Sequence, residues 1–599
     1  MTHLKALRLW PLGIIAALSV SIIAAPVVFE LEVPGGAMTA AVLAGVLIAL
    51  WWLVASRARW LERIAVAVLV PVGVVLTSLA VDLSIAGGAQ GFMAYILGFA
   101  SFVIAIGAWA VAANSLSGRA RYLALAASFL IVGALPLLVI RTEGIKGASG
   151  FVFHWRWTPT PEELLLAKGE DEPKPLPESA SIPSTVAPVA PAPVAPVAPA
   201  APVAPAAPAE WPGFRGPNRD GVVHAAPIST DWNQTPPTPM WRRAIGPGWS
   251  SFSVRGDLMY TQEQRGNDEI VACYRVSTGQ PVWRHKDPIR FYESNGGAGP
   301  RGTPTIDRNR VFSLGATAML NALDARTGKV IWAKNAAADT KREIPMWGIS
   351  SSPLIVDDLV IVSVAGTLAA YDVDNGNLRW IGPQHGGSYS SPQLVTLDGV
   401  RQVVILSAPG AVSVTPENGT LLWEHQWEGG AIVQPAITAD GDILINAMAA
   451  TGGLGTRRLA IKKSDTGWQV EERWTSNGLK PYYNDLVIHK GYAYGFDGSI
   501  LAAIDLNDGK RKWKGGRYGN GQMILLADQD LLLVMSEEGE LALVSATPDQ
   551  YQEIARIPAL NAKTWNHPVI VRDVLLIRNG EEMAAFKLPR AERAVASIQ

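Results

Sequence analysis

Cysteine is almost absent from this chain of 599 residues, which contains only Cys273. A single thiol excludes an intramolecular disulfide and any metal site built from several cysteines. Neither sign of charge predominates, because 51 Lys and Arg residues are balanced by 52 Asp and Glu residues. Nucleic-acid binding needs clustered basic residues, so we predict no nucleic-acid partner. The eight histidines show no metal-ligand spacing, and we predict no metal site.

Charged side chains are also absent from five long apolar runs near the N-terminus, at residues 9–29, 38–55, 64–81, 92–113 and 122–140. Each run has about 18 to 22 residues, enough to cross a hydrocarbon core at roughly 1.5 Å per residue. Ion-coupled transport usually needs ionisable groups inside the spans. We therefore interpret residues 1–141 as an anchor of five transmembrane helices rather than as a transporter.

Basic residues occur in alternate loops between these runs. Arg59 and Arg63 lie between the second and third runs, and Arg119 and Arg121 lie between the fourth and fifth. The positive-inside rule places these loops in the cytoplasm and everything after Arg141 outside. We thus expect a multi-pass protein of the bacterial inner membrane with its C-terminal part in the periplasm. Cleavage of the first run as a signal peptide is an alternative that leaves this side unchanged.

Residues 142–209 are expected to be a juxtamembrane segment followed by a linker rich in Pro and Ala. Proline recurs every two or three residues from Ser184 to Glu210. This spacing blocks helix and sheet and favours polyproline II, which reaches roughly 80 Å over this length at ~3.1 Å per residue. We interpret the stretch as a stiff spacer that holds the following domain away from the membrane, with a binding partner for the Pro-rich run as the alternative.

A short motif recurs in the remainder of the chain: a glycine followed four residues later by tryptophan. The five clear pairs are Gly279 and Trp283, Gly328 and Trp332, Gly376 and Trp380, Gly419 and Trp423, and Gly509 and Trp513. Three copies have an aspartate four residues before the glycine, at Asp324, Asp372 and Asp505. A small residue, which leaves room for the indole, stands six positions before each of the five glycines, at Cys273, Ala322, Ala370, Ser413 and Ala503. Weaker copies have their small residue at Ala460 (with Gly467 and Trp474), Ala542 and Ala584. Eight units spaced by 40 to 50 residues are typical of a propeller.

Each motif residue has a mechanical role. Glycine adopts the positive φ of a tight hairpin turn, and the aspartate accepts N–H groups of that turn. The indole is expected to pack on the next unit and to donate its N–H to a buried acceptor. With four strands per unit, we predict an all-β, eight-bladed β-propeller at residues 210–590, followed by a tail at 591–599.

The two ends of the predicted propeller complement each other. The last unit ends with Ala584–Leu588 and has no Trp strand after it, whereas the strand around Trp241 has no turn motif before it. We predict that these two strands pair, which closes the ring and hides both edges.

The turn motif resembles the tryptophan-docking repeat of pyrroloquinoline-quinone (PQQ) dehydrogenases, which is also found in the non-enzymatic BamB-like propellers. WPGFRGPNRDGV (Trp211–Val222), GPRGTPTID, MWGISSSPLIV and GSYSSPQLV are likewise similar to the PQQ-like β-propeller repeat family. The resemblance covers about residues 210–590 and implies the fold. The combination of five spans and a periplasmic propeller is also similar to membrane-bound glucose dehydrogenases, whose extracytoplasmic part is much longer.

Polar residues occupy matching positions just before each predicted inner strand. They are Ser251, Thr303, Ser352, Ser391, Gln434, Asn484 or Asp485, Gln522 and His567, with Arg301, Trp347 and Tyr389 close by in sequence. Inner-strand starts converge on the mouth of a propeller's central channel. These groups either cap strand ends and hold channel water, or bind a small anion, a peptide or a quinone-like ring at this mouth.

No catalytic residues are predicted. The vicinal cysteine pair of soluble PQQ alcohol dehydrogenases has no counterpart here, and no set of Asp with Glu and Asn calcium ligands is recognisable. We interpret the protein as a non-catalytic extracytoplasmic scaffold that needs no cofactor and binds an envelope protein, peptide or glycan. The alternative is a membrane dehydrogenase that uses PQQ and calcium to oxidise a sugar or alcohol and reduces membrane quinone.

Overall fold

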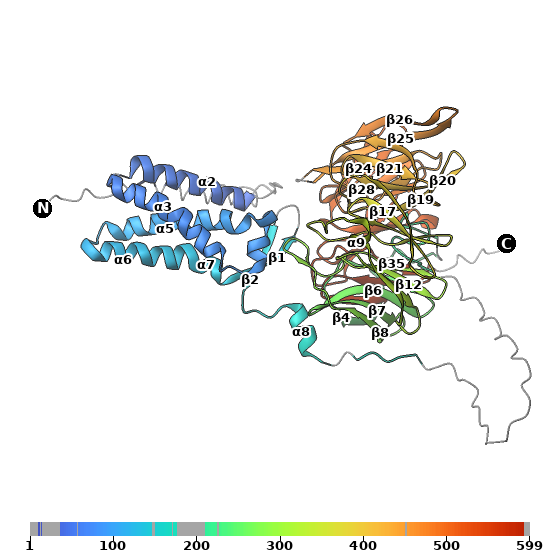
Figure 1. The fold of residues 1–599 in the computed structure, drawn as a ribbon, viewed down its shortest axis with the longest axis horizontal. Coiled ribbons are helices and arrows are strands. Elements are labelled where there is room, and N and C mark those ends of the chain that lie inside the picture. The colour runs from blue at the N-terminus through green and yellow to red at the C-terminus, as the bar shows by residue number, and fades with distance from the viewer. Residues whose placement is uncertain are drawn as a thin grey trace, which may run out of the picture. The chain divides into compact units, whose positions relative to one another are not determined.

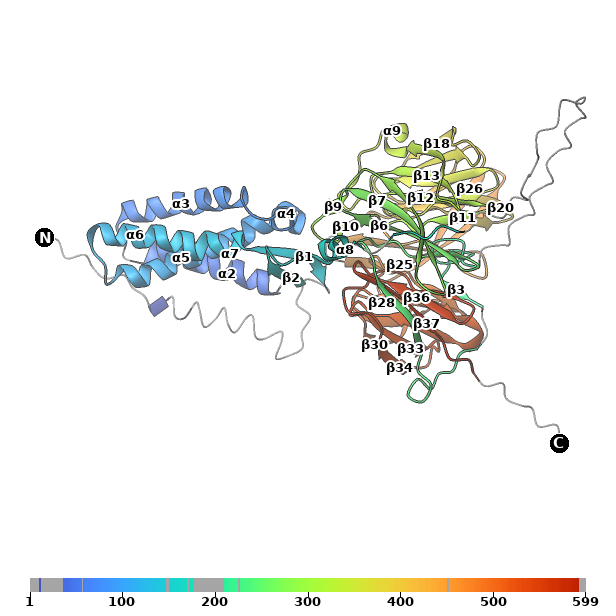
Figure 2. The same cartoon turned by 90° about the horizontal axis from the view of Figure 1, so that it is seen from below.

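The computed structural model describes residues 10–11, 14, 36–56, 58–146, 150–169, 172–176, 210–224, 227–449 and 452–591. The chain divides into two compact units, whose elements are labelled in Figures 1 and 2. The helical unit extends to Thr160 and includes the hairpin Tyr292–Ala298, and the propeller unit comprises the rest.

Apolar helices make up most of the helical unit. They are α2 (Gly36–Leu50), η1 (Trp51–Ala55), α3 (Trp60–Ser78), α4 (Leu83–Gly87), η2 (Ala89–Gly91), α5 (Met93–Ala113), α6 (Gly118–Ser128), η3 (Phe129–Ala134) and α7 (Leu135–Leu138). Two hairpins complete the unit, β1 (Ile140–Lys146) with β2 (Gly150–Trp155), and β9 (Tyr292–Glu293) with β10 (Gly297–Ala298). Helix α5 contacts α2, α3 and α6 (Figure 2).

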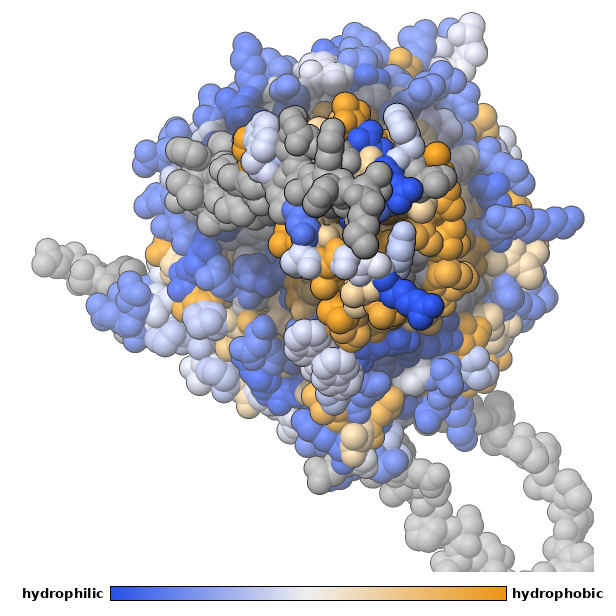
Figure 3. All heavy atoms as spheres, turned by 90° about the vertical axis from the view of Figure 1, so that its left-hand side faces the viewer, coloured by the Kyte–Doolittle hydropathy of each residue, from blue (hydrophilic) through white to orange (hydrophobic). Residues whose placement is uncertain are grey.

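Four of the five predicted spans coincide with these helices, and the first, 9–29, lies outside the described residues apart from Trp10, Pro11 and Ile14. Among the described residues, two helical segments are long and apolar enough to cross a membrane, Met93–Ala113 and Gly118–Leu138. Val42–Ala55 is a shorter apolar helix. Five crossings are therefore not shown, although large apolar side chains are exposed along these helices and appear orange in Figure 3.

The propeller unit contains eight sheets, which we number as blades 1 to 8 along the chain. Blade 1 consists of β5 (Ser253–Arg255), β6 (Leu258–Arg265), β7 (Asp268–Arg275) and β8 (Pro281–Asp287). Blade 2 consists of β11 (Thr305–Asp307), β12 (Arg310–Leu314), β13 (Met319–Asp324) and β14 (Val330–Asn335), which α9 (Ala336–Thr340) follows. Blade 3 consists of β15 (Leu354–Val356), β16 (Leu359–Val364), β17 (Thr367–Asp372) and β18 (Leu378–Gln384). Blade 4 consists of β19 (Gln393–Leu397), β20 (Val400–Ser407), β21 (Gly410–Val414) and β22 (Leu421–Gln426).

Blades 5 to 8 form the second half of the ring. Blade 5 is irregular because its inner strand has only two residues, and blade 7 because it has a fifth strand. Blade 5 consists of β23 (Ala436–Ile437), β24 (Ile443–Ala449), β25 (Gly452–Ser464) and β26 (Gly467–Ser476). Blade 6 consists of β27 (Val487–His489), β28 (Tyr492–Asp497), β29 (Ile500–Asp505) and β30 (Arg511–Arg517). Blade 7 consists of β31 (Gln522–Leu526), β32 (Leu531–Met535), β33 (Glu540–Ser545) and β34 (Glu553–Pro558), with η4 (Ala527–Gln529) and a fifth strand, β3 (Val222–Val223). Blade 8 consists of β35 (Val569–Val571), β36 (Val574–Arg578), β37 (Glu582–Lys587) and β4 (Thr238–Ala244).

The eight-bladed propeller predicted from the repeat is confirmed, and the predicted closure is found in blade 8. There β4, from the start of the domain, pairs antiparallel with β37, from its end, and Trp241 lies opposite Ala585. The apolar core is divided among the gaps between blades. One cluster, for example, joins Phe312 and Leu320 of blade 2 to Val362 and Tyr371 of blade 3.

Each docking tryptophan reaches from its own blade to the next. The residue opposite Trp332 in the same sheet is Ala322, and the Trp332 indole donates its N–H to the Val373 carbonyl at 3.1 Å. A Cβ added to Gly376 would lie 2.6 Å from this indole, and Gly376 has a φ of +70°. Glycine is required twice there, by the turn and by the close approach of the ring. The same arrangement recurs where Trp283 packs on Gly328 and Trp380 packs on Gly419. It also recurs where the ring closes, because Trp241 of blade 8 packs on Gly279 of blade 1.

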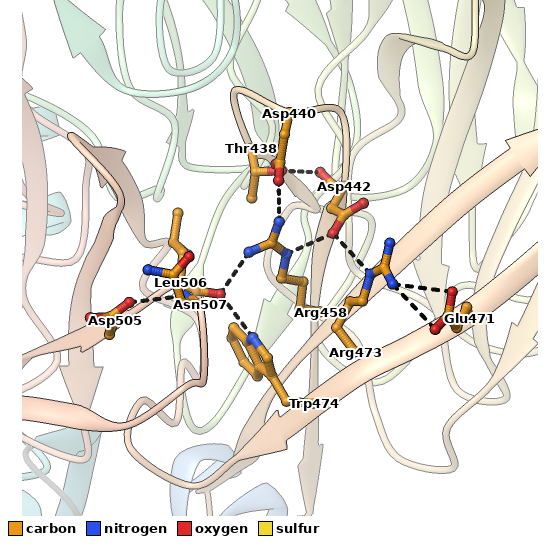
Figure 4. Close-up of polar contacts among 10 residues, drawn as sticks. All are labelled: Thr438, Asp440, Asp442, Arg458, Glu471, Arg473, Trp474, Asp505, Leu506 and Asn507. Carbon is orange, nitrogen blue, oxygen red and sulfur yellow. Dashed lines mark hydrogen bonds and ion pairs between the residues drawn. The ribbon is translucent and has the colours of Figure 1, made fainter.

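All three weaker repeats differ from the predicted alignment, and the repeat in blade 7 also lacks the tryptophan. In blade 5 the residue opposite Trp474 is Arg458 rather than Ala460, because the β25–β26 hairpin is longer than the others. Figure 4 shows the consequence: the Arg458 guanidinium and the Trp474 indole both donate to the Leu506 carbonyl. In blade 8 the equivalent residue is Ala585 rather than Ala584, and in blade 7 the Trp position is occupied by Ala555, opposite Leu543.

Trp423 is the exception among the five clear copies. Its N–H donates to Gln402 Oε1 of its own blade at 2.7 Å, and Gly467 of the long hairpin in blade 5 has no side chain near it. The closure of the ring explains why blade 7 has Ala555 in place of a tryptophan. The third and fourth strands of blade 8 come from opposite ends of the domain, so no hairpin joins them for a tryptophan to cover.

The predicted Pro-rich spacer lies outside the described residues, and the described segments on either side of it contact the propeller. The helix α8 (Pro161–Ala167) already belongs to the propeller unit, where Glu162 accepts the Gly266 N–H at 2.8 Å. Lys174 donates its N–H to the Pro281 carbonyl of blade 1, and Trp211 pairs with Val254 of the same blade. The described residues that flank 177–209 on either side thus both contact blade 1.

We expect Trp332→Ala to lower the free energy of unfolding of the propeller by roughly 3–5 kcal/mol, because it removes a buried indole and leaves a cavity against Gly376. Val330→Ala, in the same strand but half exposed, is the matched control and should cost less than about 1 kcal/mol. Urea unfolding of the purified chain, followed by tryptophan fluorescence, measures both. Equal losses of free energy of unfolding in the two variants would show that the docked Trp332 indole stabilises the propeller no more than an exposed side chain of the same strand.

Candidate functional site

The polar residues before the inner strands of blades 1 to 4 form a chain of hydrogen bonds between blades. The Ser251 N–H donates to Thr303 Oγ1 at 3.0 Å, the Thr303 N–H to Ser352 Oγ at 2.9 Å, and the Ser352 N–H to Ser391 Oγ at 2.9 Å. All four residues are buried. The hydroxyls of Thr303, Ser352 and Ser391 therefore each accept the N–H of the preceding blade. The Ser251 hydroxyl instead donates to the His567 carbonyl of blade 8 at 2.7 Å, so these side chains join blades at the channel.

On the other side of the channel the ring contains a charged centre. The Gln434 N–H donates to Asp485 Oδ1 at 2.7 Å, and His567 Nε2 lies 3.4 Å from Asp485 Oδ2. Burial favours the neutral carboxyl, but the Arg215 guanidinium and His567 outweigh it and hold the pKa of Asp485 below its usual value. Burial lowers the pKa of His567 more than Asp485 raises it, which leaves the imidazole neutral at pH 7.

Among the predicted ring residues, those of blades 5 to 7 have spare hydrogen-bonding capacity. Gln434 Oε1, Asn484 Nδ2 and Gln522 Oε1 are buried and have no partner among the described residues, although Gln522 Nε2 donates to the Tyr483 carbonyl at 3.0 Å. Such atoms bind water or a ligand when the space allows. The predicted ring is therefore brought together, with its first half used for blade contacts and its second half partly unused.

Arg301, Trp347 and Tyr389 form a separate cluster. Arg301 Nε donates to the Trp347 carbonyl at 3.1 Å, and the Trp347 and Tyr389 rings lie 5.0 Å apart. Nearby, burial raises the pKa of Glu269 to about 7, against the opposing effects of the Ala316 N–H and Arg301. Glu269 Oε1 accepts the Ala316 N–H at 3.1 Å and Oε2 has no partner among the described residues.

Aromatic residues that the sequence analysis missed lie beside the ring. Trp565 lies 4.7 Å from Trp249 and 4.9 Å from Tyr483 between ring centroids, and Lys563 Nζ lies 4.3 Å from the Trp565 centroid. A signal for them was present, because Trp249, Tyr389, Tyr483 and Trp565 stand one or two positions before ring residues. The mouth of the channel is thus rich in aromatic surface.

The segment Trp211–Val223, which we call the N-terminal arm, crosses the channel. It starts on blade 1, where Trp211 pairs with Val254, and ends as β3 on blade 7. Between these ends, Phe214 packs edge-on against His567 of blade 8, and Asn218 accepts from Gln393 of blade 4 at 2.9 Å. The sequence analysis identified this segment only by its resemblance to the PQQ-like repeat family. Its contacts join residues far apart in the chain, which local sequence patterns do not predict.

Two buried arginines of the arm bind the inner strands on opposite sides. Arg219 donates to the Ser352 and Pro353 carbonyls at 3.1 and 2.9 Å, and Arg215 donates to the Leu486 carbonyl at 2.6 Å. Burial, together with the nearby Arg215, lowers the pKa of Arg219 to about 10, so that it stays charged at neutral pH.

A cavity of about 840 Å³ adjoins the arm. Its walls are the inner strand of blade 4 (Gln393–Thr396), residues 435–440 of blade 5, residues 486–491 of blade 6, and Leu525, Ala527 and Asp528 of blade 7. We call it the channel cavity. This volume is in the range of ligand-binding pockets.

The residues of the channel do not fit a metal-bound quinone cofactor. No group of three or more His, Cys, Asp or Glu among the described residues could hold a metal ion. Asp485, the carboxylate of the ring, is already bound to Gln434, His567 and Arg215. Cys273 is buried opposite Trp283 in blade 1, and burial raises the pKa of its thiol.

Comparison with known proteins gives the same fold. Residues 267–515 match the protein family described as "Outer membrane protein assembly factor BamB". The BamB of Shewanella oneidensis is 24% identical over 385 residues, which cover 59% of this chain and 89% of that protein. A lanthanide-dependent methanol dehydrogenase of Methylacidiphilum fumariolicum is 34% identical over 129 residues, 20% of this chain and 19% of the enzyme. The crystal structure of BamB from Moraxella catarrhalis superimposes with a TM-score of 0.43 at 18% identity, covering 59% of this chain and 98% of that one. The family match and the sequence similarity confirm the predicted resemblance to BamB-like propellers for this part of the chain, which is also locally similar to a methanol dehydrogenase.

Glu269 should make the stability of the protein depend on pH. Its carboxyl titrates near 4.5 when unfolded and near 7 when folded, so between these values the folded protein binds more protons. The free energy of unfolding therefore falls as the pH rises through this window, and the loss is complete above pH 7. Glu269→Gln should raise the free energy of unfolding at pH 8 by on the order of 3 kcal/mol and leave it unchanged at pH 4.

Thermal unfolding at both pH values measures this effect. Glu343→Gln, at an exposed position, is the control and should change stability equally little at either pH. A Glu269→Gln effect of the same size at pH 4 and pH 8 would contradict the assignment.

Proposed function

We propose that the protein is a scaffold of the bacterial envelope, anchored in the inner membrane by its helical unit, whose propeller binds a protein, peptide or glycan in the periplasm without catalysis. The similarity of the propeller to BamB proteins, over nearly the full length of the Shewanella oneidensis relative, is the observation that carries the scaffold role. That relative is by name an assembly factor for outer membrane proteins.

Membrane anchoring is supported by where apolar surface is exposed. Leu79, Val54 and Leu123 of the helical unit are 80%, 76% and 70% exposed, and a soluble protein rarely leaves so many large apolar side chains in contact with water. A lipid environment removes this cost.

The ends of the helices support the predicted orientation. Arg121, after the fourth span, pairs with Glu62, after the second, at 3.3 Å, so the two basic loops lie at the same end. The Thr142 N–H, after the fifth span, donates to Ser84 Oγ, after the third, at 2.9 Å. Loops that alternate in this way agree with a cytoplasmic position for the basic ones and a periplasmic position for the chain after Arg141.

A quinoprotein dehydrogenase is the second candidate, and the local similarity to the methanol dehydrogenase favours it. Against it stand the absence of a metal-ligand set among the described residues and the blade-to-blade hydrogen bonds that occupy the ring. The scaffold is therefore the better supported function.

The orientation predicts the activity of reporter fusions. Alkaline phosphatase fused after residue 591 should be active, because it folds only in the periplasm, and a fusion after Ser117 should be inactive. A green fluorescent protein fusion at each site should give the opposite pattern. Phosphatase activity at Ser117 alone would place the propeller in the cytoplasm and end the proposal.

The scaffold role predicts specific crosslinks in intact cells. The Tyr482 ring lies 5.1 Å from that of Tyr483 at the aromatic mouth. A photoreactive amino acid in place of Tyr482 should capture an envelope protein or glycan, whereas the same group at Lys329, in an exposed hairpin turn, should not. Added PQQ and calcium or lanthanide should produce no dye-linked oxidation of alcohols or aldoses by the purified chain. Oxidation that depends on these additions would establish the dehydrogenase instead.

A further inference from the structure

The channel cavity has unpaired positive charge at its deep end. Arg215 Nη1 lies 3.6 Å from the Asp485 carboxylate. The other carboxylate at this level is Asp220 of the arm, which lines the cavity, accepts the Val222 N–H and forms no ion pair with either arginine. No described carboxylate lies within ion-pair distance of Arg219, and the Nε atoms of both arginines are buried without a partner. Buried charges are normally compensated by a partner of opposite sign. An anionic group in the cavity would supply it.

The charges at the rim are different, because they are paired. Arg458 binds Asp440 and Asp442, as Figure 4 shows, and Lys490 Nζ binds Asp530 at 2.8 Å. His224 binds Asp528 at 2.8 Å. Among the described residues of this cavity, the unpaired positive charge at the level of the arm is therefore that of Arg219.

The walls of the cavity present strand edges. The innermost strands β19, β23 and β27 each pair on one side only, and β23 is just two residues long, which opens the wall of blade 5. Blade 7 shows how such an edge is used: Val222 and Val223 of the arm pair with Leu525 and Leu526 of β31 as a parallel fifth strand. An inner edge of this channel thus already accepts an extended chain.

The side chains between the strand edges are largely apolar. Leu394, Ile437 and Ile488 line the wall and are only partly buried. Alternate side chains of an extended peptide would contact them, while its backbone pairs with the edges.

We propose that the channel cavity binds the C-terminal end of an extended, apolar peptide segment of a partner protein, with its carboxylate at Arg219 and Arg215. This proposal rests on the scaffold function and names the class of its partner. The direction of the bound peptide follows from where the two arginines lie along the inner strands. Arg219 and Arg215 bond to residues at the start of inner strands (Pro353 and Leu486), whereas the rim is formed by turns at the ends of such strands, roughly 10 Å away for three residues. A chain that enters from the rim reaches the guanidiniums with its end, and only a carboxyl end is attracted.

Fluorescence anisotropy on the full chain in detergent tests this inference. The probe is the peptide Ala-Ser-Val-Thr-Val-Leu with fluorescein at its N-terminus, as the free acid and as the C-terminal amide. We expect the free acid to bind about tenfold more tightly, because a charge-assisted hydrogen bond contributes about that factor. Equal affinities for the two forms would overturn the proposal.

Two variants locate the site. Ala439→Trp, at an exposed rim position, should obstruct the entrance and weaken binding at least tenfold, whereas Lys329→Trp, on the outer hairpin of blade 2, should have no effect. Arg219→Gln should make the free acid and the amide bind alike, with circular dichroism as the check of folding. A purely structural role of Arg219 would weaken both peptides and preserve their ratio. If inorganic phosphate binds and neither peptide does, the cavity is a small-anion site and the proposal of peptide binding is refuted.

The outcome is separable from that of the scaffold function. If Ala439→Trp abolishes peptide binding but leaves the crosslinks in cells, the scaffold stands and its partner binds elsewhere, which removes the inference. If the peptide binds the cavity but no crosslink forms in cells, the cavity stands and the scaffold role fails.

Discussion

The contact on which the propeller depends is the indole of one blade lying against the hairpin glycine of the next. It combines buried apolar area with a hydrogen bond to a backbone carbonyl. Examples are Trp241 of blade 8, which packs on blade 1, and Trp474 of blade 5, which packs on blade 6. Because each sheet covers its faces only with its neighbours, no blade has a core of its own. The ring is therefore stable only when it closes, which the pairing of β4 with β37 achieves.

Closure also explains where the repeat is imperfect. Blade 8 has no continuous hairpin between its third and fourth strands, so Ala555 has no turn to cover. Blade 5 has a long outer hairpin and a short inner strand, and Arg458 stands where other blades have a small residue. These departures lie on the side of the channel where the ring has unused polar atoms and where the cavity opens. The parts of the ring that are freed from the repeat are thus those available for binding.

The candidate site could be predicted in part. Equivalent positions before the inner strands identify Ser251, Thr303, Ser352 and Ser391, because strand starts in a propeller must converge. The sequence did not distinguish hydroxyls that join blades from amides with free atoms, since that depends on which neighbour lies within 3 Å. The N-terminal arm was beyond prediction, because Arg215 and Leu486 are 271 positions apart and meet only after closure.

The sequence by itself determined the number of blades, the hairpin turns and the strand that closes the ring. These follow from local spacing: glycine, tryptophan and small residues at fixed intervals, each with a steric reason. Only the tertiary structure decided that the arm crosses the channel, that one of its two buried arginines is ion-paired and the other is not, and that a cavity opens beside a two-residue strand. Such features arise from long-range contacts and from small differences between similar blades. A periodic pattern encodes what the blades have in common and does not encode the position of one segment among all of them.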